Sequence, residues 1–213
     1  MTYSVKEIFL TLQGEGHHAG RPAVFMRFSG CNLWTGREQD RAKAICQFCD
    51  TDFIGTDGVN GGKFKTAKTL AQKASSIWCD TATSASQKYI VLTGGEPSLQ
   101  IDDALVDALH DEGFMIAIES NGTLPVHQGI DWVCISPKAG ADFVQTSGNE
   151  LKLVYPQPSL MPEMLPETSF DHYYLQPMDG DQTAINTKAA IDYCLKNPNW
   201  NLSVQTHKIL NIP

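Results

Sequence analysis

Short apolar runs that alternate with helical patterns constrain the fold of this chain more than any other feature of its sequence. The clearest run is Y-I-V-L-T at residues 89–93, which is typical of a buried strand. Such runs and helical patterns recur with little variation to the end of the chain, as expected for βα units around a parallel sheet. The expected strands are 5–12, 23–30, 89–93, 115–119, 132–135, 150–155, 172–175 and 202–205, and the expected helices are 66–78, 98–112 and 184–196.

Polar and glycine-rich clusters follow the carboxyl ends of these expected strands. In a parallel barrel or open α/β sheet those ends share one face, on which ligands bind. One cluster carries little information because Gly, Pro, Asn and Ser occur in any turn, but several at one edge predict a binding site. The clusters are 93–97, 119–122, 136–138, 176–179, 206–208 and the cysteine-containing segment after residue 30.

The length of 213 residues suits one domain with a sizeable core, spanning residues 1–213. A full eight-fold barrel usually needs about 250 residues, and only six or seven strands are expected in the repeat. We therefore expect an α/β fold with a partial, open (β/α)6-type barrel. Four prolines crowd residues 156–166, so we expect irregular or short helical structure there.

The charge balance argues against broad contact with nucleic acid. Sixteen basic and 24 acidic side chains give a formal charge of -8, which favours small molecules such as free nucleotides as partners. The chain has no charged leader followed by an apolar run and no stretch of eighteen apolar residues, so we expect a soluble, cytoplasmic protein with no membrane partner. Six cysteines, three of them in one loop, fit a reducing compartment; Cys79, Cys134 and Cys194 are expected to be packing residues.

Three thiols lie in one loop between residues 30 and 52. Cys31 is followed by Cys46 and Cys49, and the last two form a C-x2-C pair that can reach one metal centre. Tetrahedral zinc usually takes four ligands, and no second C-x2-C pair is present. An iron-sulfur cube held by three cysteines keeps one iron open for a ligand that is not protein. A zinc loop completed by a distant residue and three ordinary thiols both remain open on spacing alone.

Two further features point to ligand contact. The glycine-rich stretch Q-G-E-G-H-H-A-G at residues 13–20 allows close approach of backbone to a ligand, although a simple hairpin explains it equally well. Arg27 lies in an expected buried strand, where its charge needs a partner or an anion.

Taken together, the motifs resemble a known enzyme family. A three-cysteine loop after the first barrel strand, with T-G-G-E-P after the second, resembles the radical S-adenosylmethionine superfamily, although the usual C-x3-C-x2-C spacing is enlarged here to C-x14-C-x2-C across loop 31–49. The stretches L-Q-G-E-G, R-F-S-G-C-N-L-W, C-D-T-D-F, E-S-N-G-T, S-P-K and Q-T-H-K-I-L-N-I-P look like those of the 7-carboxy-7-deazaguanine synthase family. The resemblance covers nearly the whole chain.

The resemblance implies ring contraction of 6-carboxy-5,6,7,8-tetrahydropterin to 7-carboxy-7-deazaguanine with loss of ammonia, a step toward queuosine and related 7-deazapurines. It also implies a 4Fe-4S cluster, S-adenosylmethionine and Mg²⁺ as cofactors, an electron donor such as flavodoxin, and a homodimer. A radical activase that acts on a protein partner is the nearest alternative. A non-catalytic, zinc-stabilised binding module is the alternative from another class.

By the same resemblance, Cys31, Cys46 and Cys49 would hold the cluster and the Thr51 hydroxyl would bind Mg²⁺, with Asp50 and Asp52 capping turns or orienting waters. No side chain is expected to act as a conventional acid or base. The residues implied for S-adenosylmethionine are Phe48, Gly94, Gly95, Glu96, Glu119, Asn121, Ser136, Pro137, Lys138, Gln176, Pro177, Met178 and Asp179, with Glu96 also bracing its turn. Those implied for the substrate are Leu12, Gln13, Gly14, Glu15, Arg27, Thr93, His207 and the terminal carboxylate of Pro213.

Overall fold

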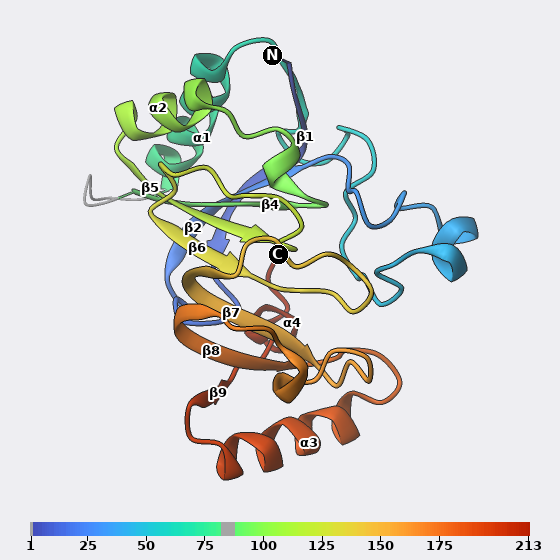
Figure 1. Cartoon of the computed structure of the whole chain (residues 1–213). Coiled ribbons are helices and arrows are strands. Elements are labelled where there is room, and N and C mark those ends of the chain that lie inside the picture. Colours follow the sequence, from blue (N-terminus) through green and yellow to red (C-terminus); the bar gives the residue numbers. More distant parts are fainter. Residues whose placement is uncertain (1, 82–87) are drawn as a thin grey trace.

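A single nine-stranded sheet forms the body of the protein in a computed structural model, which describes residues 2–81 and 88–213 (Figure 1). The strand order is β3-β1-β2-β4-β5-β6-β7-β8-β9, and neighbours from β2 to β9 are parallel while β1 pairs antiparallel with β2 and β3. The sheet is open, as expected. The strands are β1 (Tyr3–Leu12), β2 (Pro22–Phe28), β3 (Gly62–Phe64), β4 (Lys88–Gly94), β5 (Phe114–Ser120), β6 (Trp132–Ile135), β7 (Ser147–Tyr155), β8 (Ser169–Pro177) and β9 (Trp200–Leu202).

The helices accompany only some of the strand connections. Helices α1 and α2 lie together at one end of the molecule and α3 lies at the other (Figure 1). The segments that join β5 to β6 and β6 to β7, both described throughout, contain no α-helix, so the expected alternation is only partly correct. The helices are α1 (Ala67–Thr81), α2 (Asp103–Asp111), α3 (Thr183–Lys196) and α4 (Thr206–Leu210), with 3-10 turns η1 (Glu38–Lys43), η2 (Pro97–Leu99) and η3 (Pro162–Met164).

Several expected element boundaries differ from those in the structure, and two of them lie near the candidate site. The helix expected from residue 98 begins at Asp103, because the Asp102 side chain accepts a hydrogen bond from the Leu105 amide and caps it there. The strand expected at 202–205 is β9, which ends at Leu202, and Thr206 already begins α4. The proline-rich connection is irregular apart from η3, as expected.

Alternation within β7 separates apolar side chains from polar ones. In β7, Leu151 and Leu153 belong to the core cluster that includes Ala190 of α3. Glu150 and Lys152 alternate with them and therefore point to the other face. A second core cluster joins β4 and β5 to α1 and α2, so the apolar faces turn toward the helices. The polar face is left for a site.

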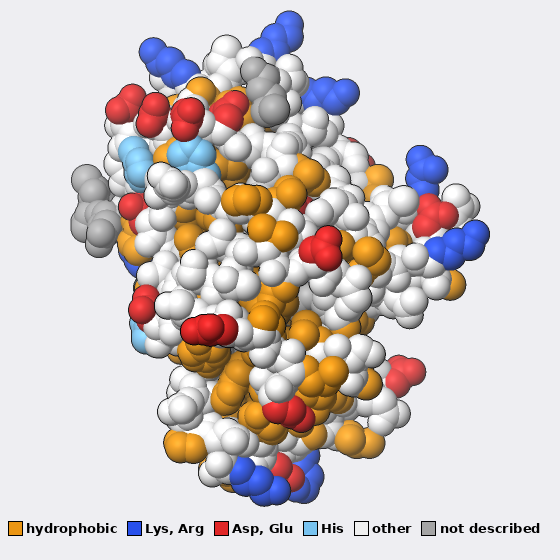
Figure 2. All heavy atoms as spheres, viewed as in Figure 1, with side chains coloured by type: hydrophobic (Ala, Val, Ile, Leu, Met, Phe, Trp, Pro, Cys, Tyr) orange, Lys and Arg blue, Asp and Glu red, His pale blue; other side chains and the backbone are white. Residues whose placement is uncertain are grey.

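The remaining cysteines fit their expected role only in part. Cys134 is buried in β6 and Cys194 is half-buried, but Cys79 is exposed on α1 and does not serve packing. Within the described ranges, no helix is both long and apolar enough to cross a membrane. The cysteine loop with η1 projects from the body (Figure 1), and Figure 2 shows side chains of both charges on this projection.

Candidate active site

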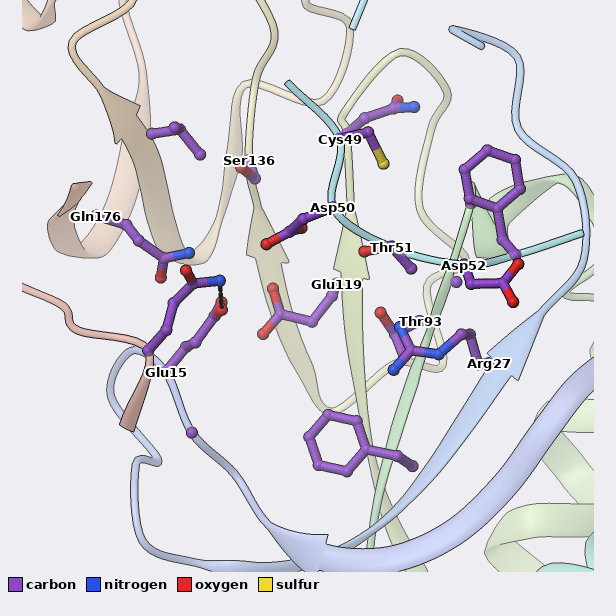
Figure 3. A pocket seen from close by; sticks show the side chains of 18 of the residues that line it. Glu15, Arg27, Cys49, Asp50, Thr51, Asp52, Thr93, Glu119, Ser136 and Gln176 are labelled. Carbon is purple, nitrogen blue, oxygen red and sulfur yellow. Dashed lines mark hydrogen bonds between the residues drawn. The ribbon is translucent and has the colours of Figure 1, made fainter. Parts of the chain in front are cut away.

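The carboxyl ends of the parallel strands surround a cavity of about 370 Å³ (Figure 3). The strand-end clusters expected from the sequence therefore do share one face. Three residues of the expected set, Glu96, Pro137 and Met178, do not line this cavity. Those that do are Leu12, Gln13, Gly14, Glu15, Arg27, Cys31, Cys46, Phe48, Cys49, Thr51, Thr93, Gly94, Gly95, Glu119, Asn121, Ser136, Lys138, Gln176, Pro177, Asp179, His207 and Pro213.

Glu96 is a buried brace beneath the cavity. Its carboxylate accepts hydrogen bonds from the Ser98 amide at 2.9 Å, the Ser120 hydroxyl at 2.9 Å and the Asn121 amide at 2.8 Å. These bonds tie the turn after β4 to the end of β5. Satisfied on both oxygens, a fully buried carboxylate is held rigidly.

The two glycines before Glu96 permit a close backbone approach. A Cβ on Gly94 would lie 2.2 Å from the Phe28 carbonyl oxygen, and one on Gly95 would lie 2.0 Å from the Gly30 carbonyl oxygen. Gly94 also has φ +129°, a conformation that side chains disfavour. The glycines thus bring the turn after β4 against the start of the cysteine loop.

The three thiols of the cysteine loop reach the same cavity. Cys46 is buried, while Cys31 and Cys49 are half-buried. A hydrogen bond with Cys46 lowers the pKa of Cys49 to about 6, and burial raises the pKa of Cys31. Among residues 2–81 and 88–213, no three His, Cys, Asp or Glu side chains are placed to hold a single ion. An iron-sulfur cluster binds each thiolate to a different iron, so its thiolates need not converge on one point, and this donor set fits one.

Arg41 organises the enlarged loop from within. Its guanidinium donates to the carbonyls of Gln47 at 2.9 Å and Cys49 at 3.0 Å. The same group lies 4.1 Å from the centre of the Trp34 ring, which is nearly buried. The insertion therefore supports the backbone that carries two of the three thiols.

Thr51 lies between two aspartates that are engaged elsewhere. The Lys208 ammonium lies 2.5 Å from Asp50, and the Lys6 ammonium lies 2.9 Å from Asp52. Asp52 also accepts a hydrogen bond from the Ile54 amide. Thr51 itself faces the cavity opposite Thr93 and Glu119 (Figure 3).

A buried ion network forms the polar wall of the cavity. Lys152 lies 2.8 Å from Glu15 and 2.9 Å from Glu119, and the Gln13 amide donates to Glu119 at 3.3 Å. Burial by itself raises the pKa of Glu15, but the charge and hydrogen bond of Lys152, with a bond from Gln205, lower it to about 2. Burial raises the pKa of Glu119.

Arg27 has the partner that its burial requires. Its Nε donates to Glu7 at 2.8 Å, and the two residues are paired across β1 and β2. The outer nitrogens point into the cavity in Figure 3, where they remain available to an anion.

On the opposite side, Lys138 donates to the Ser136 hydroxyl at 2.7 Å, and burial lowers its pKa. The Gln176 side chain accepts a hydrogen bond from Ser203 at 3.2 Å.

Relatives of known name match the chain over its whole length. A 7-carboxy-7-deazaguanine synthase of Caulobacter vibrioides is 61% identical over 213 residues, and one of Burkholderia multivorans is 59% identical, each covering 100% of both chains. The chain belongs to the 7-carboxy-7-deazaguanine synthase family. The crystal structure of QueE from Escherichia coli superposes with a TM-score of 0.70 at 26% identity, covering 96% of this chain and 94% of that one. No family model matches the chain.

One central residue of this site lies outside the synthase-family motifs and was not predicted from them. Lys152 was not expected from the sequence, although E-L-K-L-V places Glu150 and Lys152 on one face of a strand whose other face is apolar. A lysine at such a position needs buried carboxylates, and Glu15 and Glu119 supply them. Glu7 and Phe9 also line the cavity without having been expected, and Lys208 lines it as part of the expected strand-end cluster 206–208.

Proposed function

We propose that the protein converts 6-carboxy-5,6,7,8-tetrahydropterin to 7-carboxy-7-deazaguanine with loss of ammonia, as a radical S-adenosylmethionine enzyme on the route to queuosine and related 7-deazapurines. The observation that carries this proposal is that one cavity holds three thiols at one end and the Glu15–Lys152–Glu119 network at the other. The family relatives, named for this synthase activity, support the same assignment. The sheet would then be the partial (β/α)6-type barrel of the superfamily, forming a single domain.

Cys31, Cys46 and Cys49 would hold a 4Fe-4S cluster whose fourth iron takes S-adenosylmethionine. When bound, these groups supply one-electron reduction and hydrogen-atom abstraction. The protein positions the reactants and excludes water. Arg41 holds the backbone of two ligands in place.

The cofactor would lie along the turn after β4 and the ends of β6 and β8. Backbone at Gly94 and Gly95 would receive its amino group, with Glu96 holding that turn from below. Lys138 and Ser136 would bind its carboxylate and ribose hydroxyls. The remaining contacts would come from Phe48, Asn121, Pro137, Gln176, Pro177, Met178 and Asp179.

The substrate would lie at the end of the cavity formed by β1, β2 and the C-terminal segment. Arg27 would bind its carboxylate, while Gln13 with backbone of Leu12 and Gly14 would bind the pterin edge. Glu119 belongs with this group rather than with the cofactor, because it contacts Gln13 and Lys152. Thr93, His207, Glu15 and the Pro213 carboxylate complete the set.

Thr51 would bind Mg²⁺ through its hydroxyl. Magnesium prefers a few protein oxygens together with water and substrate oxygens. Lysines already engage the carboxylates on either side of Thr51, which favours the hydroxyl as the direct ligand. The substrate carboxylate near Arg27 would then share the ion.

Mass spectrometry of an anaerobic reaction tests the proposal. Protein reconstituted with iron and sulfide is mixed with S-adenosylmethionine, reductant, Mg²⁺ and 6-carboxytetrahydropterin, and no partner protein. We expect 7-carboxy-7-deazaguanine; formation of 5′-deoxyadenosine without it would mean another substrate, such as the protein partner of an activase. A colourless protein with bound zinc and no labile sulfide would instead support the binding module. The same preparation can be used to test whether the protein forms a homodimer and whether flavodoxin reduces its cluster. We propose the cytoplasm as its location.

A further inference from the structure

Lys208 joins three segments that are far apart in the sequence. Its ammonium lies 2.5 Å from Asp50, which follows the last cysteine of the loop, and 2.6 Å from Asp179, which follows β8. All three residues line the cavity. Asp179 is held in turn by the Thr183 hydroxyl at 2.9 Å, at the start of α3.

The segment that carries Lys208, residues 206–213, is attached mainly by polar contacts. Its first residue, Thr206, donates to the Gly14 carbonyl from both amide and hydroxyl at 2.9 Å. The Thr11 hydroxyl donates to an oxygen of the Pro213 terminal carboxylate at 3.0 Å. Ile209 and Leu210 are 75% and 59% exposed, so burial of apolar surface contributes little to holding this segment.

We propose that Lys208 is a positioning residue that fastens residues 206–213 over the cavity by bridging Asp50 and Asp179. Asp50 and Asp179 lie at the proposed cofactor end, whereas His207 and Pro213 lie at the proposed substrate end. One ammonium therefore couples the two ends. That assignment of ends rests on the proposed function, but the fastening itself does not.

The arrangement differs from an ordinary surface ion pair. An isolated exposed pair contributes little to stability because water and salt screen it. Here one lysine contacts two carboxylates from different segments, and those segments have other anchors, from Thr183 to Asp179 and from Arg41 to the Cys49 carbonyl. Loss of the charge would release the middle of a segment that has few other restraints.

Hydrogen exchange of the peptide covering 206–213 tests the fastening without any cofactor or substrate. Replacing Lys208→Gln is expected to increase its exchange rate about threefold to tenfold, since two ion pairs are lost. Lys208→Arg should stay near the wild-type rate. Lys188→Gln is the matched control, because it removes another exposed lysine pair, to Asp192, on α3 away from the cavity.

Salt provides a second measurement on the unaltered protein. Raising NaCl from about 0.05 to 0.5 M should increase exchange of this peptide in the wild type and much less in Lys208→Gln. If Lys208→Gln fails to fold, the exchange rates of Asp179→Asn and of the wild type in the salt series still test the fastening. The proposal is overturned if neither Lys208→Gln nor Asp179→Asn raises the exchange rate of this peptide. It is also overturned if salt does not raise that rate in the wild type, or if Lys188→Gln raises it as much as Lys208→Gln does.

Kinetic measurements then test whether the fastening by Lys208 positions the substrate in the proposed reaction. Lys208→Gln should raise KM for the pterin several-fold and increase 5′-deoxyadenosine formed without product, while Lys208→Arg restores coupling. Unchanged KM and coupling would overturn the positioning role even if exchange rises. If wild-type protein makes no product, the proposed function fails, and the exchange experiment still decides the fastening.

Discussion

At the scale of single residues, the site is defined by how several of its charged groups are paired. Lys152 is shared by Glu15 and Glu119, and the aspartates beside Thr51 are engaged by Lys6 and Lys208. The charges are therefore fixed before any ligand enters. Removing one charged side chain should leave its partner as a buried charge without compensation, which lowers the free energy of unfolding.

Replacing Lys152→Met tests this network through its pH dependence. Two buried carboxylates would lose their cation, at a cost of about 3–5 kcal/mol in free energy of unfolding. In the wild type, the lowered pKa of Glu15 stabilises the fold above its ordinary value of 4.5, and this contribution is lost as the pH falls toward 2. In the variant, stability should instead fall as the pH rises from 5 to 8, because its carboxylates must ionise while buried.

Urea unfolding at several pH values measures both trends. Lys188→Met, which removes a surface pair, should cost less than about 1 kcal/mol at every pH. An equal loss for Lys152→Met at pH 5 and pH 8 would contradict the network.

Replacing Thr51→Ala tests the magnesium assignment. Turnover should fall about tenfold to a hundredfold, and its response to Mg²⁺ should weaken, while iron content stays the same. Thr35→Ala is a suitable control, because Thr35 lies in the same loop but bonds Asp40 and does not line the cavity. Unchanged magnesium dependence would refute the assignment.

At the scale of elements, the cysteine loop and the turn after β4 are fitted to one another. The close approach at Gly94 and Gly95 sets the position of the first cysteine, and Arg41 sets that of the last. The contacts at Gly94 and Gly95 are between backbone atoms, so side-chain rearrangement cannot relieve a substitution there.

Replacing Gly94→Ala should therefore displace the loop. A Cβ 2.2 Å from a carbonyl oxygen, together with φ +129°, should cost about 1–3 kcal/mol and reduce iron bound after reconstitution. Gly113→Ala has a positive φ of +83° but meets no atom of residues 2–81 and 88–213 within 4 Å, so it should lower stability by about 1 kcal/mol without affecting iron. Equal iron content in the two variants would argue against the fitted contact.

Replacing Arg41→Lys should weaken cluster retention. In the wild type, Nη1 of Arg41 donates to both the Gln47 and Cys49 carbonyls while its Nε donates to Glu38, and a lysine ammonium cannot keep all of these contacts. We expect the variant to lose iron to a chelator faster than the wild type, as measured by absorbance. Its free energy of unfolding should be nearly unchanged. Lys43→Gln on the same 3-10 helix is the control, and equal rates in both variants would contradict the role of Arg41.

The sequence predicted the elements better than their ends. Apolar runs such as 89–93 correspond to β4, but the Asp102 cap moved the start of α2, and the strand expected at 202–205 ends at Leu202, before α4 begins at Thr206. The strand-end rule correctly brought the site residues together. Lys152 was missed because its partners lie 33 and 137 residues away along the chain, at Glu119 and Glu15.

At the scale of the whole molecule, the open sheet leaves a gap that non-strand segments bridge. Thr206 contacts Gly14, the Gly16 amide donates to Ser203, and Thr11 contacts Pro213. One wall of the cavity thus consists of the first and last parts of this chain.

A tag added after Pro213 should reduce kcat/KM about tenfold to a hundredfold, because it displaces a group proposed to touch the substrate. The same tag before residue 2 is the control, since the N-terminal strand begins away from the C-terminus (Figure 1). Turnover and the melting temperature should be measured on both forms. Full activity of the C-terminally extended form would exclude the role of the Pro213 carboxylate.

The bridge between residues 11–16 and 203–213 has a consequence for biosynthesis of the protein itself. The strands from β2 onward can pair with a neighbour soon after each is synthesised, since most contacts run between successive strands. The cavity wall, in contrast, needs contacts across about 190 residues and so forms late, after nearly all of the chain has emerged. A nascent chain would thus carry its three thiols beside an incomplete cavity, whose last wall would form only as the final step of folding.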